Sequence, residues 1–238
     1  MRLRPSLTLL GSFAALGTLI SCKIATSADA TTASLQVLDI GICAPTQGGF
    51  SATSTNPYFP FQAGSQWIYD GEEAGAAIHL EITALNKQEN VGGVTTRVIE
   101  ERETANGELT EISRNFFAQT SDGTVCYFGE EVDIYEGGKI VGHEGAWRGD
   151  QPGNAPGIIM PALPKSGMKF QFESAPGVAE DQGTIVGSGT VDVPAGHFTE
   201  TIRIREFNPL DGGKDLKIYA AGVGLIVDGT LQLTSYTP

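Results

Sequence analysis

Apolar and polar residues alternate along most of the chain from about residue 66 onward. Residues 77–85 alternate in this way, which is typical of a strand with one buried face. Similar segments follow one another, separated by turn dipeptides such as Asn106-Gly107 and Asp228-Gly229. No segment has the apolar spacing of a long amphipathic helix. The pattern therefore predicts an all-β protein.

The short connections predict the way in which the strands pair. Successive strands joined by tight turns usually lie side by side, so we expect a single antiparallel meander of about ten strands. A sheet of that size in one domain curls or splits. The expectation is a barrel or half-barrel, with a β-sandwich as the alternative.

Two segments depart from the alternation. Residues 56–71, NPYFPFQAGSQWIYDG, contain two prolines that favour an extended entrance to the first strand, and this segment marks the start of the domain. Residues 149–166 contain four prolines around an apolar centre of Ile158, Ile159 and Met160. This region is predicted to be a long loop that buries its middle.

The N-terminal residues have the pattern of an export signal. Arg2 and Arg4 precede an uncharged apolar run, and Leu19-Ile20-Ser21-Cys22 follows. This tetrapeptide resembles the lipobox of bacterial lipoproteins, which implies cleavage before Cys22 and lipidation, for example with palmitate, of its thiol. Cleavage after Ala28-Asp29-Ala30, which would give a soluble secreted protein, is the alternative.

These features predict three parts. Residues 1–21 would be the signal peptide, residues 22–55 a flexible tether rich in Ala, Thr, Ser and Gly, and residues 56–238 the β-rich domain. Once Cys22 is lipidated or removed, Cys43 and Cys126 remain as an even pair in an oxidising compartment, where a disulfide is their expected use. Two separate buried thiols are the alternative.

The charge restricts the classes of partner. The chain carries a formal net charge of −13, and removing residues 1–21 takes away Arg2 and Arg4 and no acid, which lowers it to −15. A surface this acidic argues against binding nucleic acid or anionic lipid headgroups. The expected membrane association is therefore through the lipid anchor, in the bacterial cell envelope and most simply the outer membrane.

Two glycine-containing segments carry a second resemblance. Val193-Pro194-Ala195-Gly196-His197-Phe198 and Tyr219-Ala220-Ala221-Gly222-Val223-Gly224-Leu225 resemble a pattern of uncharacterised secreted bacterial β-rich proteins. The strand order and the export signal also resemble outer-membrane lipoprotein carriers, whose curved sheet holds acyl chains. That resemblance implies an acyl chain or another apolar small molecule as ligand, with residues 149–166 as the lid.

One segment could support catalysis. Residues 130–136, EEVDIYE, place Glu131, Asp133 and Tyr135 on one face of a strand, which could serve a hydrolase or lyase together with His143. The same residues fit the solvated face of a strand. The histidines form no HxH or HExxH motif, and no cofactor-binding or metal-binding motif is present, so no cofactor or metal is expected.

Aromatic residues supply the remaining candidates. A curved sheet could direct some of them into an apolar pocket, and packing in the core is the alternative. The candidate ligand-binding residues are Trp67, Tyr69, Tyr127, Trp147 and Met160. The sequence thus predicts a lipid-anchored binding or structural module without catalysis, and the carboxylate-based enzyme is the alternative.

Overall fold

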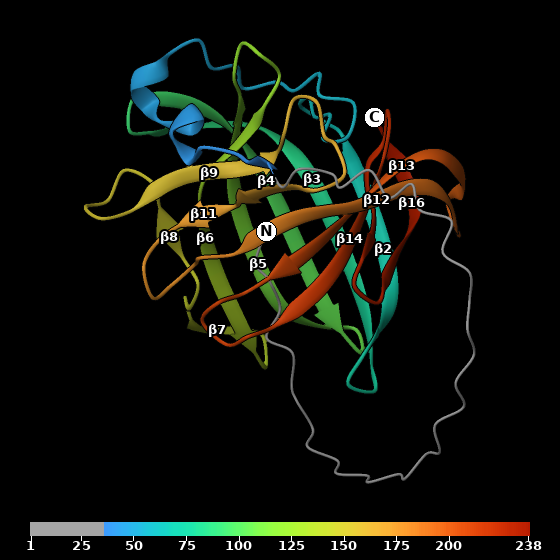
Figure 1. Cartoon of the computed structure of the whole chain (residues 1–238). Helices are drawn as coiled ribbons and strands as arrows, with labels where there is room; N and C mark the ends of the chain where they lie inside the picture. Colours follow the sequence, from blue (N-terminus) through green and yellow to red (C-terminus); the bar gives the residue numbers. More distant parts are fainter. Residues whose placement is uncertain (1–35) are drawn as a thin grey trace, which may run out of the picture.

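The computed structural model describes residues 36–238, and within them the protein is all-β (Figure 1). No helix within this range has the length and apolar character needed to cross a membrane. Two 3-10 helices, η1 (Ile40–Cys43) and η2 (Pro45–Gln47), precede the main strands. The strands are β1 (Gln36–Val37), β2 (Gln66–Glu73), β3 (Ala76–Val91), β4 (Val94–Ala105), β5 (Glu108–Gln119), β6 (Val125–Glu136), β7 (Lys139–Gly142), β8 (Trp147–Arg148), β9 (Ala155–Met160), β10 (Met168–Gln171), β11 (Glu173–Ser174), β12 (Gln182–Val193), β13 (Gly196–Phe207), β14 (Lys214–Ala220), β15 (Gly224–Asp228) and β16 (Leu231–Thr237).

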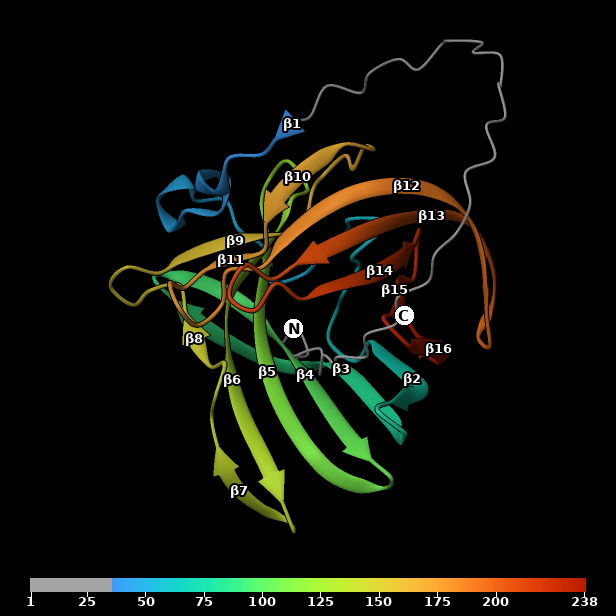
Figure 2. The same cartoon turned by 60° about the horizontal axis from the view of Figure 1, so that its bottom comes forward.

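The strands form one large sheet built from two antiparallel meanders (Figure 2). The first runs from β2 to β6 and the second from β12 to β16, and pairing of β16 with β2 joins them. The predicted antiparallel pairing of successive strands in one sheet is therefore confirmed. The sheet is mixed because β1 and β10 are parallel, and its ladder, which runs from β1 to β11, does not close on itself.

The sheet has more strands than the sequence pattern predicts. β1, β8 and β11 contain two residues each. Segments this short hold too few residues for an alternation to be visible, so tertiary pairing rather than local pattern defines them. The long strands follow the expected alternation, and Ile78, Leu80 and Ile82 of β3 are buried as predicted.

The predicted turns occur where the sequence places them. Asn106 and Gly107 connect β4 to β5 and both have positive φ, 51° and 83°. This conformation twists the hairpin in the same sense as its strands, and asparagine followed by glycine adopts it at little cost.

The segment predicted to be a long loop contains a strand. Residues 155–160 form β9, which pairs with β6 and with β11, so the expectation of a continuous loop over 149–166 is wrong. Pro156, which lacks an amide N–H, lies near the start of the strand and misled the prediction. The burial predicted for the apolar centre is confirmed, since Ile158, Ile159 and Met160 are all inaccessible to solvent or nearly so.

The described part of the predicted tether belongs to the folded domain. Cys43 is fully buried and forms a disulfide with Cys126 of β6, with a Cα–Cα distance of 5.6 Å. Phe50 packs edge-on against Phe128 at 5.3 Å, and the backbone of Ser51 pairs with Gln119. The tether prediction is therefore wrong over residues 36–55, because small polar residues there are held by a disulfide and by backbone hydrogen bonds.

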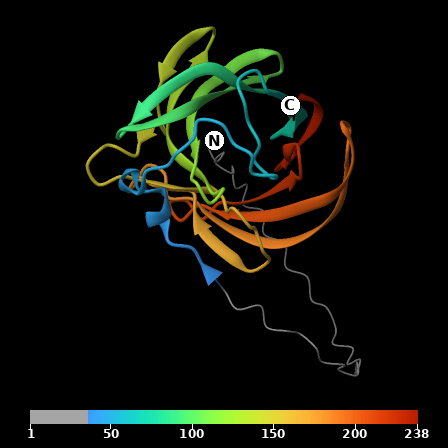
Figure 3. The ribbon, with the colours of Figure 1, turned by 90° about the horizontal axis from the view of Figure 1, so that it is seen from above.

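Residues 50–62 then cross one end of the sheet, in cyan in Figure 3. Asn56 Nδ2 donates to the carbonyl oxygens of Gly123 and Pro161, and Pro57 O accepts from Gly222 N at 2.7 Å. Phe59 packs against Phe117 at 5.2 Å between ring centroids. This segment links the turns of both meanders, so it covers their shared end.

Opposite ends of the ladder are linked by one short segment. β10 pairs with β12 on one side, whereas β11 pairs with β9 on the other. The two strands are separated only by Phe172, which is 2% exposed and whose amide donates to Asp181 O. The first and last parts of the sheet therefore approach each other at residues 168–174.

We expect that loss of the disulfide destabilises the domain. The Cys43→Ser/Cys126→Ser variant frees a segment with a sequence separation of 83 residues. The chain-entropy model gives a loss of roughly 3–5 kcal/mol for such a loop. Urea unfolding of both proteins, with and without reductant, measures it. Reductant should lower the stability of the wild type and leave that of the double variant unchanged, and an equal effect on both would contradict the prediction.

Candidate functional site

The five residues predicted from the sequence as ligand contacts are all buried. Trp67 Nε1 donates to Val223 O at 2.7 Å, and Tyr69 OH donates to Leu225 O at 2.8 Å. These bonds connect β2 to β15 and to the turn before it. The cavity that both side chains line has a volume of about 40 Å³, which is space for water but not for a small-molecule ligand, whose sites span about 300–1,000 Å³.

Tyr127 and Trp147 lie in a different part of the interior. The Tyr127 ring stacks on Phe117 at 4.8 Å and contacts Trp147 edge-on at 5.2 Å, while its hydroxyl donates to Asn115 Oδ1. Met160 is fully buried on β9. The five residues thus lie in two separately packed groups. All of them pack in the core, which was the alternative to a ligand pocket.

A larger cavity lies outside these groups, between the N-terminal segment and the region around β9. Its volume is about 560 Å³. Leu163 on its rim is 73% exposed. We call it the groove, and its lining residues are Leu38, Asp39, Gly41, Ile42, Gln47, Asp122, Thr124, Ile158, Pro161, Ala162, Leu163 and Met168.

The two carboxylates of the groove already have partners in the protein. Asp39 accepts from the amide of Gly41 at 2.9 Å and caps η1. Asp122 accepts from the Thr120 hydroxyl and from the amide of Thr124. Burial raises the pKa of Asp122, but these hydrogen bonds outweigh it and leave the pKa below its usual value. The side chains that remain for a ligand are mainly apolar.

The acidic stretch 130–136 splits between the two faces of β6. Glu130 is 3% exposed and faces inward, whereas Glu131 is exposed. Asp133 Oδ1 lies 3.1 Å from His143 Nδ1, and its other oxygen accepts from Arg114 at 3.0 Å. The structure therefore brings together the histidine and one of the carboxylates that the catalytic alternative requires.

This pair has the environment of a surface ion cluster. The His143 side chain is 65% exposed, and its Nδ1 also lies 2.7 Å from Val132 O. Arg114 contacts Glu100 as well as Asp133. Across residues 36–238 there is no group of three His, Cys, Asp or Glu side chains placed to hold a metal ion.

The sequence reading missed a cluster of charged residues on the inner face of β13, β14 and β15. Lys217 is 2% exposed and forms an ion pair with Asp228 and a longer one, 3.7 Å, with Glu206. Strand register places them together, because Ile204 faces Lys217 and Glu206 faces Asp215 across the β13–β14 pair. The sequence contains one sign of this cluster: Glu206 occupies the position that follows Ile202 and Ile204 in the alternation of β13, where another apolar residue would be expected.

The pKa values of this cluster reflect its burial. Burial raises the pKa of Glu206 to about 8, with the charges of Asp228 and Asp215 adding to the effect and Lys217 opposing it. Burial likewise raises the pKa of Asp181 to about 6. The pKa of Lys217 would fall on burial, but Asp228 and Glu206 raise it above its usual value. The cluster therefore contains carboxyl groups whose ionised form is disfavoured, mainly by burial.

Several polar atoms in the interior have no hydrogen-bond partner among the described residues. They are both carboxylate oxygens of Glu206, the hydroxyl of Tyr219, Oδ1 of Asp181 and Nε1 of Trp147. Their residues are all 5% exposed or less. Buried polar groups in proteins are nearly always satisfied by protein or water, so these atoms point to an additional partner.

Comparison with known proteins adds no assignment. No family model matches the chain, and neither a curated protein nor a solved structure matches it. The evidence on function therefore comes from the residues of this chain and their arrangement.

Stability should fall as the pH rises from about 5 to about 8. In this window folded Glu206, with its pKa of about 8, keeps a proton that the unfolded chain has lost. The slope from this group is at most about 1.4 kcal/mol per pH unit, and Asp181 acts in the same direction below about pH 6.

The Glu206→Gln variant should lose the part of this dependence that Glu206 supplies and keep the part supplied by Glu173, whose pKa burial also raises well above its usual value. Urea unfolding across the pH range measures it. Glu200→Gln, which alters an exposed residue of the same strand, is the matched control and should keep the slope of the wild type. A wild-type stability that rises over this range would contradict the prediction.

Proposed function

We propose that the protein is an exported, lipid-anchored envelope protein that binds a small apolar ligand in the groove without chemical transformation. The observation that carries this proposal is the groove itself. Its volume of about 560 Å³ lies within the range of about 300–1,000 Å³ typical of small-molecule sites. The cavity beside Trp67 and Tyr69, at about 40 Å³, has no such room.

The chemistry of the groove favours an apolar ligand. Leu38, Ile42, Ile158, Ala162 and Leu163 supply hydrocarbon surface from two segments far apart in the sequence. Burial of apolar ligand surface against them stabilises a complex by about 25 cal/mol per Å². Since the carboxylates of Asp39 and Asp122 already accept hydrogen bonds from the protein, a neutral molecule or a hydrocarbon chain suits the groove better than an anion.

The disulfide supports a groove that exists before the ligand arrives. Cys43 ends η1, which forms one wall, and its bond to Cys126 fixes that wall to β6. β9, which contributes Ile158, pairs with the same strand. A preformed site avoids the cost of ordering its walls on binding.

The curled form of the sheet is part of the proposal. We describe it as a half-barrel whose two ends are brought near each other by residues 168–174 and whose covered end is formed by residues 50–62. Pairing of β10 with β12 and of β11 with β9 supports this description over a sandwich. In this arrangement the groove lies outside the half-barrel, unlike the inner concavity that the sequence suggested.

The lipid anchor comes from the sequence, because Leu19-Ile20-Ser21-Cys22 lies outside the described residues. Thirteen residues separate Cys22 from Gln36, where β1 begins, and even a fully extended chain of that length spans only about 45 Å. Leu38, two residues further on, lines the groove. An anchor at Cys22 would therefore hold the groove near the membrane, which is a source of apolar molecules. We propose that this membrane is the outer membrane.

The catalytic alternative has less support. Asp133 and His143 are close, but the histidine is largely exposed and the carboxylate is shared with Arg114. A general base needs a substrate held within hydrogen-bond reach, and neither residue lines the groove.

Binding to the groove can be tested with the neutral fluorescent probe phenylnaphthylamine. The Leu163→Asp variant places a carboxylate on the rim and should weaken probe binding about tenfold, because an apolar ligand would then bury a charge. Fluorescence titration measures the affinity, and native mass spectrometry of protein from its own envelope identifies any natural ligand.

The matched control for this test is Leu210→Asp. Leu210 is another exposed leucine, 45% accessible, in the turn between β13 and β14. This variant should bind the probe as the wild type does. Equal affinities in all three proteins would show that the probe does not use the groove, and the proposal would then be wrong.

Membrane association should depend on Cys22. We expect that Cys22→Ala moves the protein from the membrane fraction to the soluble fraction, because the thiol that would carry the lipid is gone. Fractionation followed by immunoblotting measures the distribution. Cys43→Ser/Cys126→Ser, which keeps Cys22, is the control and should remain with the membrane. An unchanged distribution of Cys22→Ala would contradict the anchor.

A further inference from the structure

The charged cluster on the inner face of the sheet is separate from the groove. Glu206 on β13, Lys217 on β14 and Asp228 on β15 come from three consecutive strands. Tyr219 shares the face of Lys217, two positions along β14, and is fully buried. None of these residues lines the groove.

Carboxyl groups outnumber the cation that they share. Asp228, Glu206 and Asp215 all act on the charge of Lys217. Lys217 in turn acts on Glu101 of β4 and on Asp181, which precedes β12. Five carboxyl groups therefore interact electrostatically with one ammonium group, and two of them, Asp228 and Glu206, form ion pairs with it where burial penalises charge.

The atoms without hydrogen-bond partners among residues 36–238 are mostly acceptors. Both oxygens of Glu206 and Oδ1 of Asp181 can only accept while the groups are ionised, and the Tyr219 hydroxyl can do either. Lys217 Nζ lies 3.7 Å from Glu206, beyond hydrogen-bond distance. A carboxylate with two open oxygens matches the paired N–H groups of a guanidinium ion or the donors of an ammonium ion.

The surroundings favour an organic cation over a metal ion. No trio of His, Cys, Asp or Glu side chains in the described part of the chain has the placement of metal ligands. The charge of Asp228 acts on the hydroxyl groups of both Tyr69 and Tyr219, so two tyrosine side chains lie within its range.

We propose that this inner-face cluster is a binding site for the guanidinium or ammonium group of a small organic cation, held by Glu206 with Asp181 and Tyr219 beside it. The site is independent of the groove and of its apolar ligand. Binding would place a positive charge among carboxyl groups that now share Lys217.

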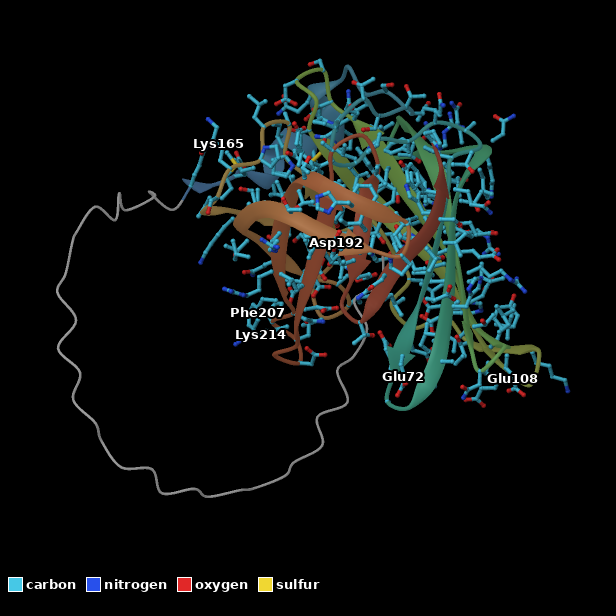
Figure 4. All side chains as sticks on the ribbon, turned by 90° about the vertical axis from the view of Figure 1, so that its right-hand side faces the viewer. Glu72, Glu108, Lys165, Asp192, Phe207 and Lys214 are labelled. Carbon is cyan, nitrogen blue, oxygen red and sulfur yellow. A yellow bond between two sulfur atoms is a disulfide. The ribbon has the colours of Figure 1, made fainter. Side chains whose placement is uncertain are left out.

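An approach from the end of the sheet opposite residues 50–62 is part of the proposal. Figure 4 shows Glu72, Glu108, Phe207 and Lys214 toward one end of the molecule, opposite the end covered by residues 50–62. Glu206 and Asp215 adjoin two of these labelled residues in sequence. Glutamates at this end would attract a cation and raise its local concentration.

The test is a calorimetric titration of the purified full-length protein with methylguanidinium, with methylammonium, and with methylurea as the neutral isostere. We expect heat and saturation with the cations and none with methylurea. Glu206→Gln should weaken cation binding by at least about tenfold. Glu72→Gln, an exposed glutamate at the same end, should bind within about twofold of the wild type, because exposed charges contribute little.

Proton release distinguishes a direct contact from general attraction. Glu206 is largely protonated at pH 7, so the wild type should release close to one proton per bound cation, whereas Glu206→Gln should release none from this position. Titrations in buffers of different ionisation enthalpy measure this proton release.

Three results would show that the proposal is wrong. They are equal binding of methylurea and methylguanidinium, normal cation binding by Glu206→Gln, and no cation binding by the wild type. The last result would leave internal water as the partner of these atoms. None of these results bears on probe binding in the groove.

Discussion

The pairing of β16 with β2 is the contact on which the rest of the fold depends. It joins the last strand of the chain to the first long strand and so turns two meanders into one sheet. Side chains reinforce it, because Trp67 and Tyr69 of β2 donate hydrogen bonds to carbonyl oxygens near β15. Contacts between residues this far apart in sequence close a long loop, and the entropy they cost must be repaid by burial.

The two ends of the domain are built differently, and this difference separates the two proposed sites. At one end, residues 50–62 cover the sheet and the disulfide ties residues 36–49 to β6, which leaves the groove on the outside. At the other end lie hairpin turns such as Asn106-Gly107. An apolar ligand and an organic cation would thus bind at opposite ends without competing for one space.

The inner face is an unusual environment for charge. Lys217 and Glu206 are each 2% exposed, and the ion pair with Asp228 offsets part of the cost of burying them. Burial is the main cause of the raised pKa of Glu206, about 8, and the charges of Asp228 and Asp215 add to it. A site of this kind lowers stability unless something binds there, and proteins retain such strain mainly where it serves a function.

The sequence by itself determined the all-β class, the long strands, the Asn106-Gly107 turn and the cysteine pair. The strands follow from the alternation of apolar and polar residues, the turn from its Asn-Gly dipeptide, and the cysteine pair from the even number of remaining cysteines. All three can be recognised from local sequence or by counting residues. It did not determine that residues 36–55 pack, that β9 lies in a proline-rich segment, or that Trp67 and Tyr69 fill the core instead of lining a pocket. Nor did it join Glu206, Lys217 and Asp228, because their meeting depends on the register of three strands, and register is set by the packing of the whole sheet.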